Sequence, residues 1–336
     1  MNCRLTISRY CTFFLCIILF SAACSPAVRR VEPTDLMWPP PPSKPKIKYI
    51  QSIYTEDDIG RIYSLKENLF GKEYDDTLKR PYSVFAARNK LLITDIGAKF
   101  VVILDLTTKR MMVVGGDGTL RYPVATISDA SGALYVADAS NEKVMVYDEN
   151  GRYRTSFAVD GKPVALAINE RLGILYVVDR QRHKVIALDK QGRQLFTFGS
   201  FGDSAGNFNV PLAIAIGADD KLYVLDSGNF RVQVFDAKGA FLFKFGAVGD
   251  RAGLFANPKG IALDSAGHIY VTDAAFSNFQ VFDGQGKVLL YVGSLGPAPG
   301  QMHLPAGIAI DDQDRIYVAD QLNRRIEVFQ YLKDTP

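Results

Sequence analysis

The stretch at residues 258–283, PKGIALDSAGHIYVTDAAFSNFQVFD, decides the fold, because the chain repeats it. Residues 305–329, PAGIAIDDQDRIYVADQLNRRIEVF, follow the same plan. Six such segments end an aliphatic or aromatic run on an aspartate, and these aspartates are Asp95, Asp138, Asp179, Asp226, Asp273 and Asp320. They lie 43, 41, 47, 47 and 47 residues apart. A period in the forties with β-rich repeats is typical of a propeller with about four strands per blade.

Each unit predicts the same succession of strands. A proline precedes a run of small or apolar residues that suits an innermost strand, and these prolines are Pro81, Pro123, Pro163, Pro211, Pro258 and Pro305. A turn, the strand that ends on the aspartate, a third strand and an outer strand follow. Apolar residues alternate along these strands, as expected of sheets packed face to face. We therefore expect an all-β, six-bladed propeller of four-stranded antiparallel blades over residues 80–336.

The connectors between units carry a second motif. Residues 198–208, FGSFGDSAGNF, and residues 245–255, FGAVGDRAGLF, share the pattern FG-x-x-G-x-x-x-G-x-F. Together with the repeated strands, this pattern resembles NHL repeats over about residues 80–330. The resemblance implies a six-bladed β-propeller. The first unit matches least, since it lacks the tyrosine and the clear glycine turn of the others.

The last unit ends soon after its third strand and lacks an outer strand of its own. Residues 47–54, IKYIQSIY, form a strand pattern that belongs to no unit. We expect this segment to pair with the third strand of the last unit and close the ring, because closure removes exposed sheet edges. Residues 46–79 would then hold the closing strand and a crossover to the first blade.

Residues 1–23 predict a signal peptide for export. Arg4 and Arg9 precede an apolar run at residues 11–20 that is too short to span a membrane. The small residues before Cys24 resemble the lipobox of bacterial lipoproteins, which implies cleavage before Cys24 and its acylation. Ordinary secretion, with Cys24 incidental, is the alternative.

Acylation at Cys24 would anchor the protein to a bacterial membrane, on the periplasmic side or at the cell surface. The sequence does not distinguish the inner from the outer membrane. Residues 24–45 would follow the anchor as a tether, because their proline run at 39–42 favours stiff polyproline II. We therefore predict an exported, lipid-anchored propeller.

Cysteine usage and charge exclude several classes of site and partner. All four cysteines lie within the first 24 residues, so the propeller holds neither a disulfide framework nor a cysteine-ligated metal. The formal net charge is only +3. A value so close to zero, together with the export signal, argues against a nucleic-acid partner.

The six repeat aspartates have two interpretations. They could form a ring of metal ligands, or they could build turns by accepting hydrogen bonds from the backbone. We favour turn-building, because symmetry places one carboxylate in each blade, far from the others. We also expect no catalytic residue, no metal and no cofactor. The three histidines, His183, His268 and His303, are not expected to converge.

Two arginines each follow a repeat aspartate by five residues, Arg231 and Arg325. Some NHL proteins bind RNA on the equivalent surface, but the near-neutral charge favours ion pairing or a solvated rim here. We include both arginines in a predicted partner-binding face with Phe201, Phe230 and Phe276. The two other connector phenylalanines, Phe208 and Phe255, are instead expected to pack between blades.

The predicted function is non-catalytic. We expect a binding or scaffold module for a protein, peptide or glycan partner in the cell envelope, because the innermost strands offer no ring of polar residues. The alternative is a metal-dependent propeller enzyme, since amidating lyases and gluconolactonase-like lactonases share this architecture. Three or more metal-binding groups converging at the mouth of the central channel would favour the enzyme.

Overall fold

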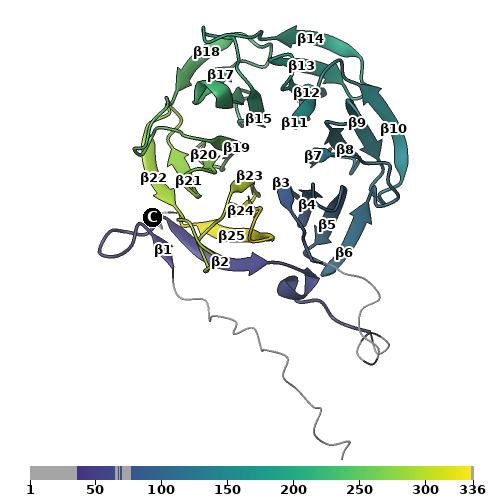
Figure 1. Cartoon of the computed structure of the whole chain (residues 1–336), viewed down its shortest axis with the longest axis vertical. Coiled ribbons are helices and arrows are strands. Elements are labelled where there is room, and N and C mark those ends of the chain that lie inside the picture. The colour runs from purple at the N-terminus through teal and green to yellow at the C-terminus, as the bar shows by residue number, and fades with distance from the viewer. Residues whose placement is uncertain (1–35, 65–66, 68, 70–76, 334–336) are drawn as a thin grey trace, which may run out of the picture. The chain divides into compact units, whose positions relative to one another are not determined.

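Six sheets stand around a central axis in the computed structural model, which describes residues 36–64, 67, 69 and 77–333 (Figure 1). Five of the sheets have four antiparallel strands, and the sixth has five. The predicted six-bladed propeller is therefore confirmed. The signal peptide at 1–23 and the lipidation at Cys24 lie outside the described residues and stay predictions.

Each blade begins at the axis with the strand that follows a repeat proline (Figure 1). The first three blades contain β3 (Pro81–Ala87), β4 (Lys90–Asp95), β5 (Phe100–Asp105) and β6 (Arg110–Val114); β7 (Pro123–Ser128), β8 (Leu134–Asp138), β9 (Lys143–Tyr147) and β10 (Tyr153–Ala158); and β11 (Pro163–Asn169), β12 (Ile174–Asp179), β13 (Lys184–Asp189) and β14 (Gln194–Phe198).

The next two blades have the same strand order. They contain β15 (Pro211–Ile216), β16 (Leu222–Asp226), β17 (Arg231–Phe235) and β18 (Phe241–Phe245); and β19 (Pro258–Leu263), β20 (Ile269–Asp273), β21 (Asn278–Phe282) and β22 (Val288–Val292). Two short 3-10 helices interrupt the strands, η1 (Glu56–Ile59) and η2 (Ser227–Asn229). Within the part of the chain that the structure describes, none of the helical segments reaches the length and hydropathy of a membrane span.

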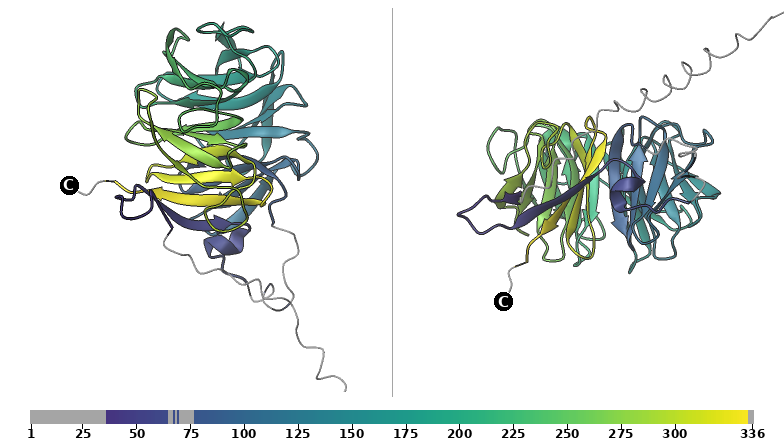
Figure 2. Two further views of the ribbon diagram at one scale, coloured as in Figure 1. Left: turned by 60° about the vertical axis from the view of Figure 1, so that its left-hand side comes forward. Right: turned by 90° about the horizontal axis from the view of Figure 1, so that it is seen from below.

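The last blade is completed from the other end of the chain. It contains β23 (Pro305–Ile310), β24 (Arg315–Asp320), β25 (Arg325–Tyr331), β2 (Ile47–Ile53) and β1 (Met37–Trp38). Strand β2 runs antiparallel to β25, with Ile47 opposite Tyr331 and Ile53 opposite Ile326. Figure 2 shows this purple strand along the edge of the yellow blade. The predicted closure by residues 47–54 is confirmed.

A fifth strand lies outside the closing strand. In β1, Met37 pairs with Lys48 and Trp38 pairs with Ile47. The Trp38 ring also meets the ring of Phe329 edge to face, with centroids 5.8 Å apart. Part of the stretch predicted as a tether, residues 24–45, thus packs on the last blade.

Small residues in the innermost strands let the blades approach one another. A Cβ atom built on Gly260 would lie 2.5 Å from the carbonyl oxygen of Ala306 in the next blade. A Cβ atom on Gly307 would lie 2.6 Å from the Cα of Ser83 in the first blade. Any larger side chain would push the blades apart, which explains the small residues after the repeat prolines.

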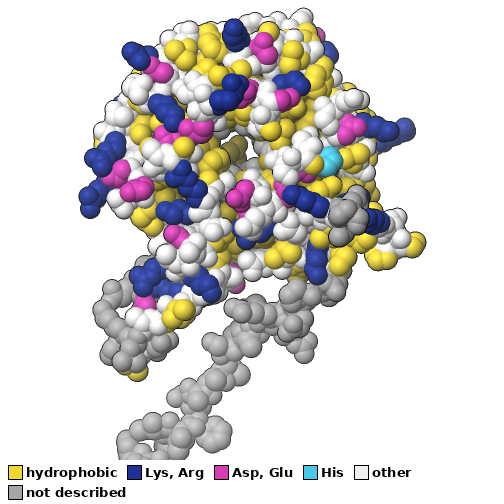
Figure 3. Space-filling model, turned by 180° about the vertical axis from the view of Figure 1, so that it is seen from behind, with side chains coloured by type: hydrophobic (Ala, Val, Ile, Leu, Met, Phe, Trp, Pro, Cys, Tyr) yellow, Lys and Arg dark blue, Asp and Glu magenta, His cyan; other side chains and the backbone are white. Residues whose placement is uncertain are grey.

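Connections between strands give the propeller two different faces. We call one of them the connector face. It carries the turns between the second and third strands, and the links from each outer strand to the next blade. The hairpin face carries the first-to-second and third-to-fourth turns. Figure 3 shows the hairpin face, where basic and acidic side chains are interspersed around a hollow.

Candidate functional site

The repeat aspartates are structural elements of the connector face. All six are fully buried. Asp95, for example, accepts hydrogen bonds from the backbone N–H groups of Lys79 (2.6 Å) and Arg80 (3.0 Å) before the first strand. It also accepts from Gly97 and Ala98 in the following turn, both at 2.9 Å. Each carboxylate thus ties the start of its blade to the turn after the second strand.

Arg231 and Arg325 are buried inside the fold, where each pairs with a carboxylate. Arg325 is 1% exposed; it pairs with Asp320 at 3.1 Å and donates to the carbonyl of Gln301 at 2.7 Å. Arg231 is 6% exposed and pairs with Asp226 at 2.8 Å. Their guanidinium groups hold the long connectors to the blades. We therefore remove both arginines from the predicted partner-binding face, because burial leaves no charged surface for a partner.

The predicted aromatic residues separate into exposed and packed groups. Phe201 is 69% exposed, whereas Phe230 and Phe276 are only partly buried in their turns. Phe230 packs against the core between the fourth and fifth blades. Phe208 and Phe255 are fully buried, as expected. Phe201 is thus the best placed of the predicted contact residues.

Phe201 is one of three equivalent exposed residues. Val248 is 66% exposed and Leu295 is 64% exposed, at the same position of the next two connectors. Each forms a parallel bridge to a buried connector residue, so the three connectors share one geometry. We call Phe201, Val248 and Leu295 the apolar arc. Sequence reasoning missed Val248 and Leu295, although each stands three residues beyond the end of its outer strand, as Phe201 does.

The first three blades give the connector face a basic sector. We call five of its exposed cations the basic arc, which comprises Lys99, Arg121, Lys143, Lys162 and Arg180. The acidic residues of the same sector are Asp117, Glu142 and Asp160, and Asp160 already pairs with Arg182. The connector face therefore combines a basic side with an apolar side.

The histidines do not form a site together. The His183 Nδ1 accepts a hydrogen bond from the N–H of Val210 at 3.0 Å, and its ring lies 4.9 Å from the Phe201 ring. On the opposite face, the His268 Nδ1 lies 2.8 Å from a carboxylate oxygen of Asp264. His303 is exposed on the connector face.

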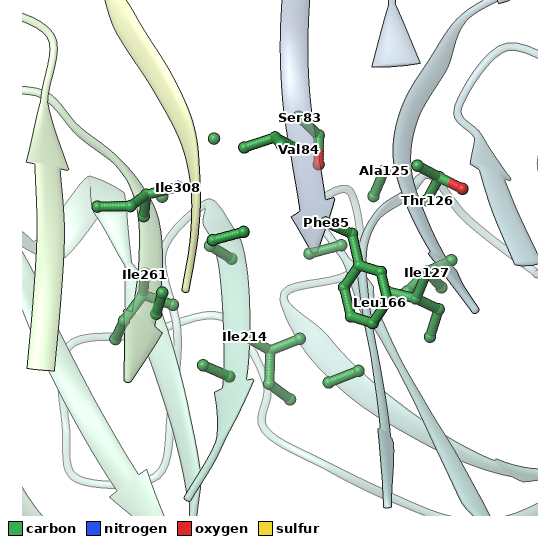
Figure 4. Close-up of a pocket in the computed structure, with 18 of the residues that line it drawn as sticks. Ser83, Val84, Phe85, Ala125, Thr126, Ile127, Leu166, Ile214, Ile261 and Ile308 are labelled. Carbon is green, nitrogen blue, oxygen red and sulfur yellow. The ribbon is translucent and has the colours of Figure 1, made fainter. Parts of the chain in front are cut away.

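The six innermost strands enclose a cavity of ≈ 510 Å³, which we call the hub. Most of its wall is aliphatic (Figure 4), and the lining includes Val124, Val164, Leu212, Ile214, Ile261 and Ile308. Small-molecule sites are typically concave cavities of about 300–1,000 Å³ with apolar walls and few polar groups. The hub has both properties.

Lys259 is a charged exception in the hub wall. It follows its repeat proline directly, a position that the other blades fill with Tyr82, Val124, Val164, Leu212 and Ala306. Burial and the nearby positive charge of Arg180 lower the pKa of the Lys259 amine. Among the described residues, no carboxylate lies within ion-pair distance of this amine. Its nearest acidic neighbour, Asp273, already accepts hydrogen bonds from Ala256 and Asn257.

Arg180 is a second exception at the connector-face mouth of the hub. It directly follows Asp179, where the other blades have Ile96, Ala139, Ser227, Ala274 and Gln321. Its guanidinium is exposed, and its charge acts on both Lys259 and Tyr82, which line the hub. The third and fifth blades thus each place a cation near the connector-face end of the hub, close enough for one charge to act on the other. The sequence could have indicated both residues, because each places a charge at a repeat position that is uncharged in the other blades. Sequence reasoning missed this signal.

The hub does not fit the metal that propeller lactonases and lyases would need. Among residues 36–64, 67, 69 and 77–333, no three histidine, cysteine or acidic side chains gather closely enough to hold a metal ion. At the hairpin-face end, Asp129 and Glu170 line the hub, but both interact with Lys190, at 3.4 and 2.8 Å. Calcium requires six or more oxygen ligands, which aliphatic walls do not supply.

A comparison with known protein families also finds NHL repeats in this sequence. The NHL repeat family matches residues 208–235 and 255–282, which lie in the fourth and fifth blades. This match confirms the resemblance drawn from the sequence. None of the curated proteins matches the chain in sequence.

Several solved propellers share the fold. A streptogramin B lyase is 14% identical with a TM-score of 0.58, and the match covers 76% of this chain and 94% of the lyase. A gluconolactonase from Xanthomonas campestris is 16% identical with a TM-score of 0.59, covering 76% of this chain and 86% of the enzyme. An auxiliary nutrient binding protein from Bacteroides thetaiotaomicron is 13% identical with a TM-score of 0.63, and the match covers 77% of this chain and 71% of that protein. At these identities, the similarity shows the fold alone.

Proposed function

We propose that this six-bladed propeller of NHL repeats is a non-catalytic binding module whose connector face holds a protein partner in the cell envelope. The observation that carries the proposal is the apolar arc beside the basic arc on one face. Exposed loops on a rigid scaffold are where binding residues concentrate. The partner surface that fits this face presents an acidic side and an apolar side.

The apolar arc supports a protein partner over a small polar ligand. Phe201, Val248 and Leu295 are large, each about two-thirds exposed, and repeated on three neighbouring connectors. Single exposed apolar residues are ordinary, whereas contiguous apolar surface marks interaction sites, and we infer that these three residues contribute to one such surface. Aromatic residues such as Phe201 are enriched where protein interfaces bury surface.

The basic arc contributes the electrostatic part of partner recognition. Charges around an interface steer association and select the partner more than they raise affinity. Five exposed cations over three blades outnumber the acidic residues of that sector, while the whole chain carries only +3. An acidic partner surface is therefore favoured, and binding should weaken as salt screens these charges.

An envelope location follows from the N-terminal prediction. We place the propeller outside the cytoplasm, anchored through acylated Cys24, because the signal-like segment and the cysteine stand together in sequence. Metabolic labelling with an alkyne fatty acid tests this step. Wild-type chain should take up the label, and a Cys24→Ser variant should not; equal labelling of both chains would contradict anchoring at this residue.

Substitution of the apolar arc tests the function itself. In membranes solubilised with mild detergent, wild-type protein should co-purify with a defined partner, and a Phe201→Ala, Val248→Ala, Leu295→Ala variant should lose it. The matched control changes exposed leucines on outer strands, Leu195, Leu242 and Leu289, to alanine. These side chains are 44–51% exposed but lie away from the connector face. Equal retention by both variants would contradict the proposal.

The enzymatic alternative makes a different prediction. A metal-dependent lyase or lactonase would bind a divalent cation in the hub, and activity would disappear on chelation. Titration of the purified chain with Ca²⁺ and Zn²⁺, followed by calorimetry, separates the two functions. The binding-module proposal expects no stoichiometric hub site, and a site abolished by substitution of hub residues would overturn it.

A further inference from the structure

The hub has the size and wall of a small-molecule site, and its chemistry is polarised from one end to the other. Its volume is ≈ 510 Å³, and aliphatic side chains farther along the innermost strands line it, such as Leu166, Ile214 and Ile261 (Figure 4). The connector-face mouth carries Lys259 and Arg180. At the other end, Asp129 and Glu170 pair with Lys190, and the exposed Arg88 also lines the hub.

The positive charge of Lys259 lowers the stability of the fold unless an anionic group pairs with it. Its side chain is partly buried in the hub wall, and burial of a charge without a partner is unfavourable. Uncharged residues occupy the equivalent position in the other five blades, so the architecture does not require a lysine there. Departures from a local rule that bring no structural gain are expected at functional sites.

No described group of the protein serves as the counter-ion. The carboxylate of Asp273 is fully buried, and its two oxygens accept hydrogen bonds from Ala256, Asn257 and Ala275. Arg180 adds a second positive charge at the same mouth instead of neutralising the first. The mouth therefore carries two cations without an ion-pair partner among the described residues, at one end of a mostly apolar cavity.

We propose that the hub binds an amphiphilic organic anion, with a carboxylate held by Lys259 and Arg180 and an aliphatic body lying against Leu166, Ile214 and Ile261. Hydrogen bonds between a cation and a carboxylate are among the strongest that proteins form. The aliphatic body would replace water against the hub wall, which is favourable in proportion to the apolar area covered. A medium-chain fatty acid has both parts.

This ligand shares one residue, Arg180 of the basic arc, with the protein partner proposed above, and is otherwise separate from it. The hub opens between the blades at the axis, whereas the apolar arc lies on the connectors of the third to fifth blades. Variants of the hub leave Phe201, Val248 and Leu295 unchanged. Failure of one proposal would therefore leave the other standing.

Equilibrium dialysis with radiolabelled decanoate tests the inference on the full chain carrying Cys24→Ser, which removes the predicted acylation. We expect one decanoate per chain. Acetate should bind far more weakly, because it lacks the apolar body, and decanol and decyltrimethylammonium should not compete, because they lack the negative charge. Absence of saturable decanoate binding would overturn the proposal, as would equal competition by decyltrimethylammonium.

Two variants locate the binding site. Lys259→Leu introduces the residue found at the equivalent position, Leu212, and should weaken decanoate binding at least tenfold. Arg180→Ser introduces the equivalent of Ser227 and should weaken it severalfold. The matched control, Arg251→Ser, removes an exposed cation of the same face that lies outside the basic arc and does not line the hub, and should leave affinity within twofold. Unchanged affinity of Lys259→Leu would place the ligand elsewhere and overturn the assignment.

A head-group comparison decides the chemistry of the anion. Decyl phosphate has the same aliphatic body with a phosphate head. If it binds and decanoate does not, the carboxylate assignment is wrong. If decanoate binds more tightly than decyl phosphate, and Lys259→Leu abolishes this preference, the inference is supported as stated.

Discussion

The Ser52 hydroxyl in β2 donates a hydrogen bond of 2.7 Å to the Glu327 carboxylate in β25, across the seam that closes the ring. Glu327 is fully buried, and its other oxygen lies 2.7 Å from the Arg325 guanidinium. Gln233 and Gln280 occupy the equivalent position of the two preceding blades, where their amides bind the long connectors. The closing seam thus has an ionisable group where its neighbours have a neutral one.

Glu327 should make the stability of the ring depend on pH. Burial raises the pKa of this carboxyl to about 8, well above its ordinary value of 4.5. Between these two values the folded protein retains a proton that the unfolded chain has lost, so stability falls as pH rises from about 5 to 8. A Glu327→Gln variant should lack this decline, so between pH 5 and 8 the wild-type protein should lose roughly 1–4 kcal/mol more unfolding free energy than the variant.

Urea unfolding of both chains at pH 5, 6.5 and 8 measures that effect. The wild-type midpoint should decrease across this range more steeply than the midpoint of Glu327→Gln. Parallel pH profiles for the two chains would show that Glu327 ionises normally in the folded protein.

Buried residues of β2 should hold the ring closed. Ile47 is fully buried and Ile53 is 1% exposed, whereas Ile50 on the same strand is 38% exposed. Ile47→Ala or Ile53→Ala should each cost about 2–5 kcal/mol of unfolding free energy, since each leaves a cavity. Ile50→Ala is the matched control and should cost less than about 1 kcal/mol. Chemical denaturation compares the three, and similar losses would contradict packing of β2 as the closing element.

The aspartate of each blade should be essential for the turn that it ties. Asp273 accepts backbone hydrogen bonds from both the preceding connector and the following turn. Asp273→Ala leaves several backbone donors without a partner and should destabilise the fold by about 3–5 kcal/mol, at roughly 1–3 kcal/mol for each buried unpaired group. Asp312→Ala, at an exposed position, should change stability by less than about 0.5 kcal/mol. Thermal unfolding distinguishes these outcomes, and a tolerated Asp273→Ala would refute the structural role.

Removal of the hub charge should stabilise the protein. Lys259→Leu replaces a poorly solvated amine by an apolar side chain against an apolar wall, for a gain of about 1 kcal/mol. The melting temperature should rise by about 1–3 °C for a domain of this size. Lys143→Leu, which changes an exposed residue, should not raise it. A lower melting temperature for Lys259→Leu would mean that the lysine stabilises the empty fold, and would weaken the case for a ligand.

The fold was predictable from sequence because its determinants are local and repeated. A proline before each inner strand, a glycine turn and a buried aspartate recur in nearly every unit, and the unit without an outer strand indicated closure by Ile47–Tyr54. Strand β1 was not predicted, because its two residues directly precede a run of four prolines. Its position depends on the contact between Trp38 and Phe329, which is distant in sequence.

The candidate site was only partly predictable. Phe201 was identified from its connector, but the burial of Arg231 and Arg325 depends on carbonyl groups that approach only in the folded connectors. Lys259 and Arg180 lie about 80 residues apart, and only the closed ring brings their charges together. A comparison of equivalent repeat positions would have revealed both, because each is a charge at a position that is otherwise uncharged.

Photo-crosslinking from the apolar arc tests the central claim, that the connector face holds a protein partner, most directly. A photoreactive phenylalanine analogue replaces Val248 on the connector face or Leu289 on an outer strand, two side chains that are 66% and 48% exposed. Irradiation of intact envelopes should link position 248 to one defined protein, and high salt before irradiation should reduce the yield. No product from position 248, or the same product from position 289, would contradict the account.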